Sequence, residues 1–243
     1  VQLKIKRQDW SYLASLHPPL TLVFRFEGPF SSLLQQPDLR GLAGLLREGM
    51  QTVIRDARAR GAAIHDVQLD YDCPTSKLPD YQRLVALLRT ELQPLPLSIT
   101  ALPTWLQSMA FLDLVRYVDY YVLQVHSLEK PASIQDPVSI FDHANLDRYL
   151  QAAAHIAKPF YLALPTYGYR LIFDAEGAFI GLTAEGPAPE LQPGYQSRVV
   201  LAEAQEIVMA LARLKTCPPR HCLGIVWFRL PIASDRLNWA WPA

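Results

Sequence analysis

The sequence of 243 residues lacks several features that would point to particular classes of protein. It has only three cysteines, too few for a disulfide-stabilised scaffold or for a zinc site made of four cysteines. Lysine and arginine together number 23, as do aspartate and glutamate, so no net charge draws the chain to nucleic acid or anionic lipid. No apolar run approaches the roughly 18–20 residues that span a bilayer. We therefore expect neither a nucleic-acid partner nor a membrane span.

What the sequence does contain is enough apolar material for a large core. Hydrophobic residues make up 50% of the chain and charged residues only 19%, which argues against intrinsic disorder. The first ten residues do not read as a signal peptide, which leaves open whether one was ever present. Cys217 and Cys222 are separated by four residues and could form a disulfide or remain two free thiols.

Short segments rich in β-branched and aromatic residues alternate along the chain with longer amphipathic segments. The predicted strands are 2–6, 20–27, 64–72, 96–102, 119–126, 159–165 and 223–230. The predicted helices are 38–60, 79–92, 104–116, 145–157 and 197–215. Strands that alternate with helices in this way are typical of a parallel sheet with crossover helices.

The predicted fold class is α/β, and more closely a (β/α)8 TIM barrel that forms a single domain over residues 1–243. A closed barrel needs eight strands, so either its first strand is lacking or one strand has been missed. Residues 169–185 break the alternation, because apolar runs flank Ala175-Glu176-Gly177 in the pattern of a β-hairpin. We expect this hairpin and a Pro/Gly-rich loop to form a small insertion, 169–196, after the sixth predicted strand, which is strand seven if the barrel lacks strand one.

Polar residues gather at the carboxyl ends of several predicted strands, where barrels of this type build their active sites. Alternate side chains along a strand share a face, so Gln68, Asp70 and Asp72 point to the same side. Helices cover the outer face of a barrel, so that side is the inner one. The same reasoning places three pairs on inner faces: Arg25 with Glu27, Gln124 with His126, and Trp227 with Arg229.

Two carboxylates two residues apart on one strand suit acid catalysis. Their repulsion, together with burial, raises the pKa of one carboxyl and leaves the other ionised. The carboxyl with the raised pKa can protonate a leaving group, as glycoside hydrolysis requires. Two alternatives stay open: a structural ion-pair network that includes Arg25, or a divalent metal bound by Glu27, Asp70, Asp72 and His126.

The order of these motifs resembles that of the family 18 glycoside hydrolases, which are chitinase-like barrels. Residues 68–72, Gln-Leu-Asp-Tyr-Asp, are similar to the Asp-x-Asp-x-Glu that ends the fourth strand of that family. Segments 118–126, 158–168 and 224–229 resemble its sixth, seventh and eighth strands. More narrowly, residues 69–81 resemble a bacterial domain family of unknown function that is grouped with glycosidase-type barrels. On this mapping residues 2–6 are strand two.

The resemblance implies a barrel that binds and cleaves an oligo- or polysaccharide outside the cytoplasm, with no cofactor and no metal. Asp72 would be the acid, Asp70 its electrostatic partner and Glu27 a further catalytic carboxylate. The implied substrate-binding residues are Gln68, Gln124, His126, Tyr167, Trp227 and Arg229.

The chain departs from the family pattern at several positions. Asp72 stands where the family has its catalytic Glu, which sets the carboxyl about 1.5 Å further back, and such a shift can cost roughly a hundredfold in rate. Gln68 replaces the first Asp of the motif, and His126-Ser127 replaces a Tyr-Asp pair that helps to hold an N-acetyl group. Trp227 is offset by one residue. A different glycan, or a barrel that binds carbohydrate without cleaving it, therefore stays open.

Overall fold

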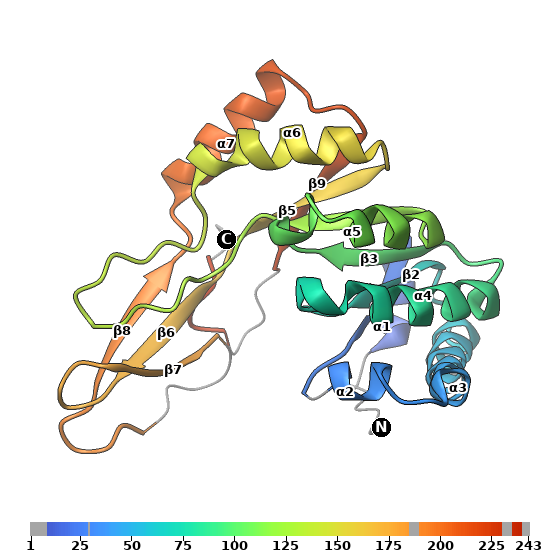
Figure 1. Ribbon diagram of the computed structural model, residues 1–243, viewed down its shortest axis with the longest axis horizontal. Helices are drawn as coiled ribbons and strands as arrows, with labels where there is room; N and C mark the ends of the chain where they lie inside the picture. The colour runs from blue at the N-terminus through green and yellow to red at the C-terminus, as the bar shows by residue number, and fades with distance from the viewer. Residues whose placement is uncertain (1–8, 29, 185–189, 230–234, 240–243) are drawn as a thin grey trace. The chain divides into compact units, whose positions relative to one another are not determined.

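The computed structural model describes residues 9–28, 30–184, 190–229 and 235–239. The chain folds into two compact units, Val1–Val122 (unit 1) and Leu123–Ala243 (unit 2), and both combine parallel strands with helices (Figure 1). The predicted α/β class is confirmed. The predicted strand 2–6 lies outside the described residues. Within the described part of the chain, no helix has the length and apolar character needed to cross a membrane.

Unit 1 is built on parallel strands. β1 (Leu20–Arg25) pairs with β2 (Ile64–Asp70), and β2 pairs with β3 (Leu97–Ala101). β4 (Tyr120–Gln124) comes next to β3 in the sheet and crosses the border into unit 2. Each strand lies within its predicted range and ends one or two residues before the end of that range.

The helices of unit 1 begin and end at residues that the sequence marks. In α3 (Leu39–Ala59) the Asp38 carboxylate accepts from the Gly41 N–H at 2.8 Å, and the chain leaves the helix through Gly61 at φ +85°. α4 (Leu78–Leu92) has a proline in its first turn and packs against α3 and α5 (Met109–Leu114). Two short helices, α1 (Trp10–Ser15) and α2 (Phe30–Leu34), were not predicted.

The predicted helix 104–116 is wrong in its first half. The segment forms a 3-10 turn, Pro103–Trp105, then α5, then a second 3-10 turn, Val115–Tyr117. Trp105 explains the break, because its fully buried indole donates to the Cys73 carbonyl at 2.9 Å. Its ring also lies edge-to-face with Tyr81, at 6.5 Å between centroids. Burial of the Trp105 side chain therefore outweighs the local helix propensity of residues 104–108.

Unit 2 contains a second parallel pair and two long helices. β5 (Phe160–Pro165) pairs with β9 (Cys222–Phe228), with Leu164 opposite Trp227. The helices are α6 (Leu146–Ile156), which follows a 3-10 turn at His143–Asn145, and α7 (Ala204–Thr216).

The insertion is a three-stranded antiparallel sheet, with the predicted hairpin at its centre. β6 (Gly168–Phe173) lies between β7 (Phe179–Thr183) and β8 (Gln196–Leu201) (Figure 1). The Asp174 carboxylate stabilises the hairpin turn by accepting from the N–H of Ala178 at 2.8 Å. Gly168 is required on packing grounds, because a Cβ there would lie 2.4 Å from the Val200 carbonyl oxygen.

β8 corrects the bounds of two predicted segments, because it contains the last residue of the predicted loop 186–196 and the first residues of the predicted helix 197–215. The predicted helix 197–215 begins only at Ala204, because its first residues pair with β6. The predicted loop 186–196 lies partly outside the described residues, and its described part, 190–195, contains no helix or strand before β8 begins. The pairing with β6 is a long-range interaction that local periodicity does not reveal.

Candidate functional site

A group of ionised side chains lies at the carboxyl ends of β1 and β2. Arg25 and Asp70 are register partners, and the Arg25 Nη1 lies 2.8 Å from the Asp70 Oδ2. The same guanidinium donates through Nε to Glu27 at 3.0 Å and through Nη2 to Asp72 at 3.4 Å. We call Arg25, Glu27, Asp70 and Asp72 the acid cluster. Three residues predicted to be catalytic thus converge on one guanidinium.

Asp70 is the buried member of the acid cluster. Its side chain is 8% exposed, and both of its carboxylate oxygens accept hydrogen bonds. Oδ2 accepts from Arg25, and Oδ1 accepts from the Thr100 hydroxyl at 2.8 Å. The Asp70 carboxylate is thus held in place by two donors, one of them charged.

Asp72 is placed differently, with 51% of its side chain exposed. Partial burial raises the pKa of Asp72, the negative charge of Asp70 raises it further, and Arg25 opposes both effects. Glu27 is 75% exposed and so is largely solvated. Asp72 is therefore accessible to a ligand, whereas Asp70 is buried and held by its hydrogen bonds. This is the difference expected between a general acid and its electrostatic partner.

Several polar residues on the same face of the sheet were not predicted from the sequence. Thr100 and Ser98 alternate along β3 and are buried. On β2 the alternation that includes Gln68 and Asp70 extends back to Asp66, which is also buried and accepts from the Tyr120 hydroxyl at 2.6 Å. The Asp66 Oδ1 has no hydrogen-bond partner. The period-two pattern of 64–72 contained this signal, because Asp66 has the same parity as Asp70.

Unit 2 holds a different group at the ends of its strands, which we call the histidine cluster: His126, Tyr167, Tyr169 and Phe228. The His126 ring stacks on Phe228 at 5.2 Å between centroids, and its Nδ1 lies 3.2 Å from the Tyr167 hydroxyl. The Tyr167 hydroxyl lies 3.0 Å from that of Tyr169. Burial lowers the pKa of His126 to about 4, so its imidazole is neutral at pH 7. Its Nε2 is buried without a hydrogen-bond partner.

The remaining predicted binding residues have separate environments. Gln68 and Gln124 are half-buried, and Trp227 on β9 is 39% exposed. Tyr167 is only 4% exposed, so its ring belongs to the packed interior rather than to a surface open for stacking. The Arg229 Nη2 forms an ion pair with the Asp235 Oδ1 at 3.0 Å. The Glu27 ion pair that the structure shows is made with Arg25.

Two further predictions are settled by side-chain placement. All three cysteines are free thiols, so the predicted alternative of a Cys217–Cys222 disulfide is wrong. For the alternative metal set, the ligating atoms of Glu27, Asp70 and Asp72 are not all within 4.8 Å of one another among the described residues. In the described part of the chain, one group offers three metal-ligating atoms within 4.8 Å of one another, and it consists of Asp142, His143 and Glu206.

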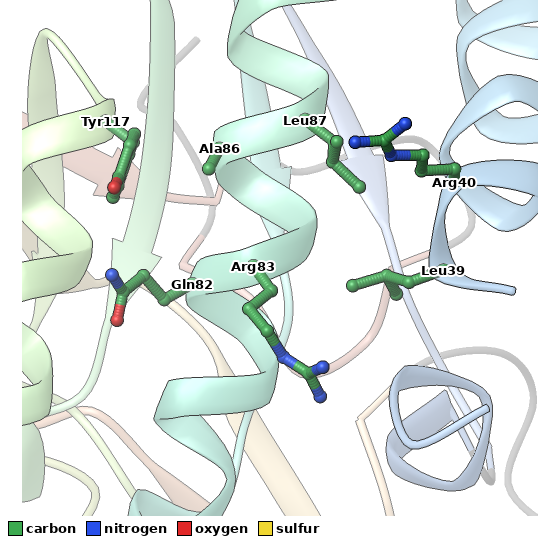
Figure 2. A pocket seen from close by; sticks show the side chains of 7 residues that line it. All are labelled: Leu39, Arg40, Gln82, Arg83, Ala86, Leu87 and Tyr117. Carbon is green, nitrogen blue, oxygen red and sulfur yellow. The ribbon is translucent and has the colours of Figure 1, made fainter. Parts of the chain in front are cut away.

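A groove lies over α4, and no residue of the acid cluster lines it. It has a volume of about 390 Å³ and includes none of the predicted site residues. Figure 2 shows Gln82, Arg83, Ala86 and Leu87 of α4 facing it. The other residues that line it are Leu39, Arg40 and Tyr117. Apolar helix side chains and paired or solvated arginines offer no acid–base chemistry, so we place the candidate site at the acid cluster.

Comparison with models of protein families identifies the family of the chain. A family model described as "Domain of unknown function (DUF3142)" matches residues 18–233. The chain belongs to this family. No curated protein matches the sequence significantly.

Solved structures share the fold of this DUF3142 chain at low sequence identity. The chitinase from Chromobacterium violaceum aligns with a TM-score of 0.63 and 13% identity, over 93% of this chain and 79% of that one. The GH18 chitinase ChiB of Flavobacterium johnsoniae gives 0.59 and 12%, over 93% and 75%. The spore cortex-lytic enzyme SleL of Bacillus cereus gives 0.61 and 14%, over 93% of this chain. The chain spans 60% of the SleL chain. The predicted resemblance to chitinase-like barrels is confirmed as a likeness of fold.

Proposed function

We propose that this DUF3142 chain is a glycoside hydrolase domain built on a partial (β/α)8 barrel, with Asp72 as its general acid. The observation that carries the proposal is the pairing of two unlike aspartates, an accessible one with a raised pKa and a buried one held by two donors. The fold likeness to chitinases and to SleL supports the choice of glycosides as the substrate class.

The acid cluster supplies each element of acid-catalysed cleavage. Protonated Asp72 donates to the glycosidic oxygen as the bond to the leaving group breaks. The negative charge of Asp70, whose carboxylate is fixed by Arg25 and Thr100, favours the protonated form of Asp72. Glu27, largely solvated, is the carboxylate that can accept a proton from an attacking water.

The binding residues form the less specific part of the proposal. Trp227 presents an exposed indole, which suits stacking against a sugar ring. Contacts of Gln68, Gln124, His126, Tyr167 and Arg229 with a glycan stay predictions. An extracytoplasmic location, where polysaccharides are found, is supported by the likeness to a spore cortex-lytic enzyme.

The proposal is tested with Asp72→Asn against a panel of bacterial and plant polysaccharides. Loss of the transferable proton should lower the release of reducing ends by about 100-fold or more, with the unfolding curve little changed. Asp56→Asn is the matched control, because Asp56 on α3 forms an exposed ion pair with Arg60, which directly follows the helix. Unchanged turnover in Asp72→Asn would remove Asp72 from the mechanism.

A second candidate is a barrel that binds carbohydrate without cleaving it. It is favoured by the 3.4 Å contact between Arg25 and Asp72, which stabilises the ionised carboxylate. In that case the wild-type chain binds a polysaccharide of the panel but releases no reducing ends from it, and Asp72→Asn changes affinity alone.

A further inference from the structure

A cavity of about 250 Å³ lies in unit 2, next to the segment that follows β4, and we call it the β4 cavity. Val125 and Ser127 line it and come just after the carboxyl end of β4. Asp142, Asn145 and Tyr149 line it from the start of the next helical segment. In α/β folds ligands bind at the carboxyl ends of the strands. No residue of the acid cluster or of the histidine cluster lines this cavity.

The insertion holds the wall of the β4 cavity in place. The wall is formed by the segment 127–142, whose two ends are joined because the Ser127 N–H donates to the Ile140 carbonyl at 3.0 Å. The middle of the segment is bound to β8 of the insertion, where both Nη atoms of Arg198 donate to its backbone carbonyls, at 2.6 and 2.8 Å. A segment that is fixed in this way gives a preformed cavity, so a ligand loses little free energy in ordering it.

The residues that line the β4 cavity supply hydrogen-bond acceptors, and none of them is a lysine or arginine. Each oxygen of the Asp142 carboxylate accepts one hydrogen bond, from the Ala144 N–H at 2.8 Å and from the Asn145 Nδ2 at 2.9 Å. A carboxylate has about four acceptor positions, so Asp142 can accept further bonds. The side chains of Ser127 and Glu129 are exposed and form no hydrogen bond or ion pair with another described residue. The cavity therefore suits a ligand that donates several hydrogen bonds.

Apolar surface lies next to these acceptors. Pro137 and Val138 line the β4 cavity, as does Tyr149. The Arg148 guanidinium lies over the Tyr149 ring, at 5.1 Å from its centroid, and donates to its hydroxyl at 3.4 Å. A pyranose has hydroxyl groups at its edge and C–H groups on its faces, so it matches a cavity with both kinds of lining. The volume is below the about 300–1,000 Å³ of pockets for drug-sized ligands, which suits a single sugar residue.

We propose that the β4 cavity binds one neutral sugar residue of the glycan, whose hydroxyl groups donate to Glu129 and Asp142. The inference rests on the proposed function, because that function makes a glycan the ligand of the chain. Hydrogen bonds from hydroxyl groups to ionised carboxylates are about twice as strong as those between neutral groups. The proposal also gives the insertion a role, since Arg198 positions the segment that forms the wall of the site.

The test maps where two neutral oligosaccharides bind on the full chain. The probes are the hexamer of N-acetylglucosamine and the β-1,4-linked hexamer of glucose, and Asp72→Asn protein is used so that the probes stay intact during the titration. We expect at least one hexamer to cause saturable NMR shifts of the backbone amides of Ser127, Asn145 and Tyr149. If neither hexamer shifts these amides, or if the shifts are confined to other parts of the chain, the inference is overturned.

Variants in the same background locate the site. Ser127→Leu adds bulk at the cavity and keeps the backbone hydrogen bond to Ile140, so it should weaken binding about 10-fold or more. Glu129→Gln removes a charged acceptor from an exposed side chain and should weaken binding about 3-fold. The matched control is Glu176→Gln, at an exposed position of the hairpin turn outside the cavity, which should leave the affinity unchanged.

Unchanged affinity in both cavity variants would overturn the inference. Cleavage of the hexamers by protein with Asp72 intact separates the two proposals. Cleavage that Ser127→Leu does not affect, with no amide shifts at the cavity, removes the β4 site alone. Binding at the cavity without any cleavage removes hydrolysis alone.

Discussion

The acid cluster of unit 1 and the histidine cluster of unit 2 accommodate buried ionisable side chains in opposite ways. Both place ionisable groups at the carboxyl ends of strands. In unit 1, the buried Asp70 forms an ion pair with Arg25 and accepts a hydrogen bond from Thr100. In unit 2, His126 is buried among aromatic rings and gives up its charge instead. Burial therefore does not decide the ionisation state of a group by itself; the partners available at that depth decide it.

The difference also sets what each cluster can do. Partially exposed carboxylates that share a guanidinium can exchange protons with a ligand, which is why the proposed chemistry lies in unit 1. The neutral imidazole of His126 packs on Phe228 and contributes to the core. Its buried Nε2 has no hydrogen-bond partner, which lowers the stability of the folded state. The following predictions test this contrast, from the largest effect to the smallest.

Placing a charge in the histidine cluster should have the largest effect. His126→Asp buries a carboxylate among aromatic rings, and we expect the free energy of unfolding to fall by about 3–5 kcal/mol. His126→Phe removes the unpartnered Nε2 and keeps ring packing, so it should change stability by about 1 kcal/mol or less. Urea unfolding measures both. If the two variants were equally stable, the cluster would not exclude charge.

The neutrality of His126 also predicts a pH dependence. In the unfolded chain the imidazole has a pKa near 6.5, whereas in the folded protein its pKa is about 4. Between these values the unfolded state binds more protons, so stability falls as the pH is lowered from 6.5 to 4, by up to about 3 kcal/mol. His126→Phe should lack this part of the pH profile. The exposed His65 provides the control, because His65→Gln should retain it.

Removing the charge of Asp70 should have an intermediate effect. Asp70→Asn keeps the size of the side chain but loses the ion pair with Arg25, and we expect a loss of about 1–3 kcal/mol. Half of the Arg25 side chain is exposed, so solvent compensates part of the loss. The apparent pKa of Asp72 should also fall, since the charge of Asp70 raises it. NMR titration of Asp72 checks this direction, and an upward shift would contradict it.

The smallest effect is expected at Glu27. Its carboxylate is 75% exposed, and exposed ion pairs contribute little, so Glu27→Gln should change stability by less than about 0.5 kcal/mol. The variant should nevertheless alter ligand affinity. A large loss of stability, measured by the same urea unfolding, would show that the acid cluster is primarily structural.

The sequence predicted the strands of both units well because each carries its own local pattern of β-branched and aromatic residues. It failed where a distant partner sets the conformation. Residues 197–201 were predicted as the start of a helix, but they pair with β6. The segment around Trp105 was predicted as one helix, but the Trp105 indole donates to the Cys73 carbonyl and the helix is interrupted there. Cys217 and Cys222 could likewise not be settled, because spacing along the chain does not give the distance between sulfurs.

For the candidate site, the sequence by itself determined that Gln68 and Asp70 share a face, because side-chain alternation is a local property of a strand, and β2 ends at Asp70 before Asp72. It did not determine that Arg25 would bridge three carboxylates, that Thr100 would hold Asp70, or that Asp66 would be buried with an oxygen unsatisfied. The contacts of Arg25 with Asp70 and Asp72 and of Thr100 with Asp70 join residues 30 to 47 positions apart. Only the pairing of β1, β2 and β3 brings them within hydrogen-bond distance, and so the tertiary structure decided which carboxyl is locked and which is open.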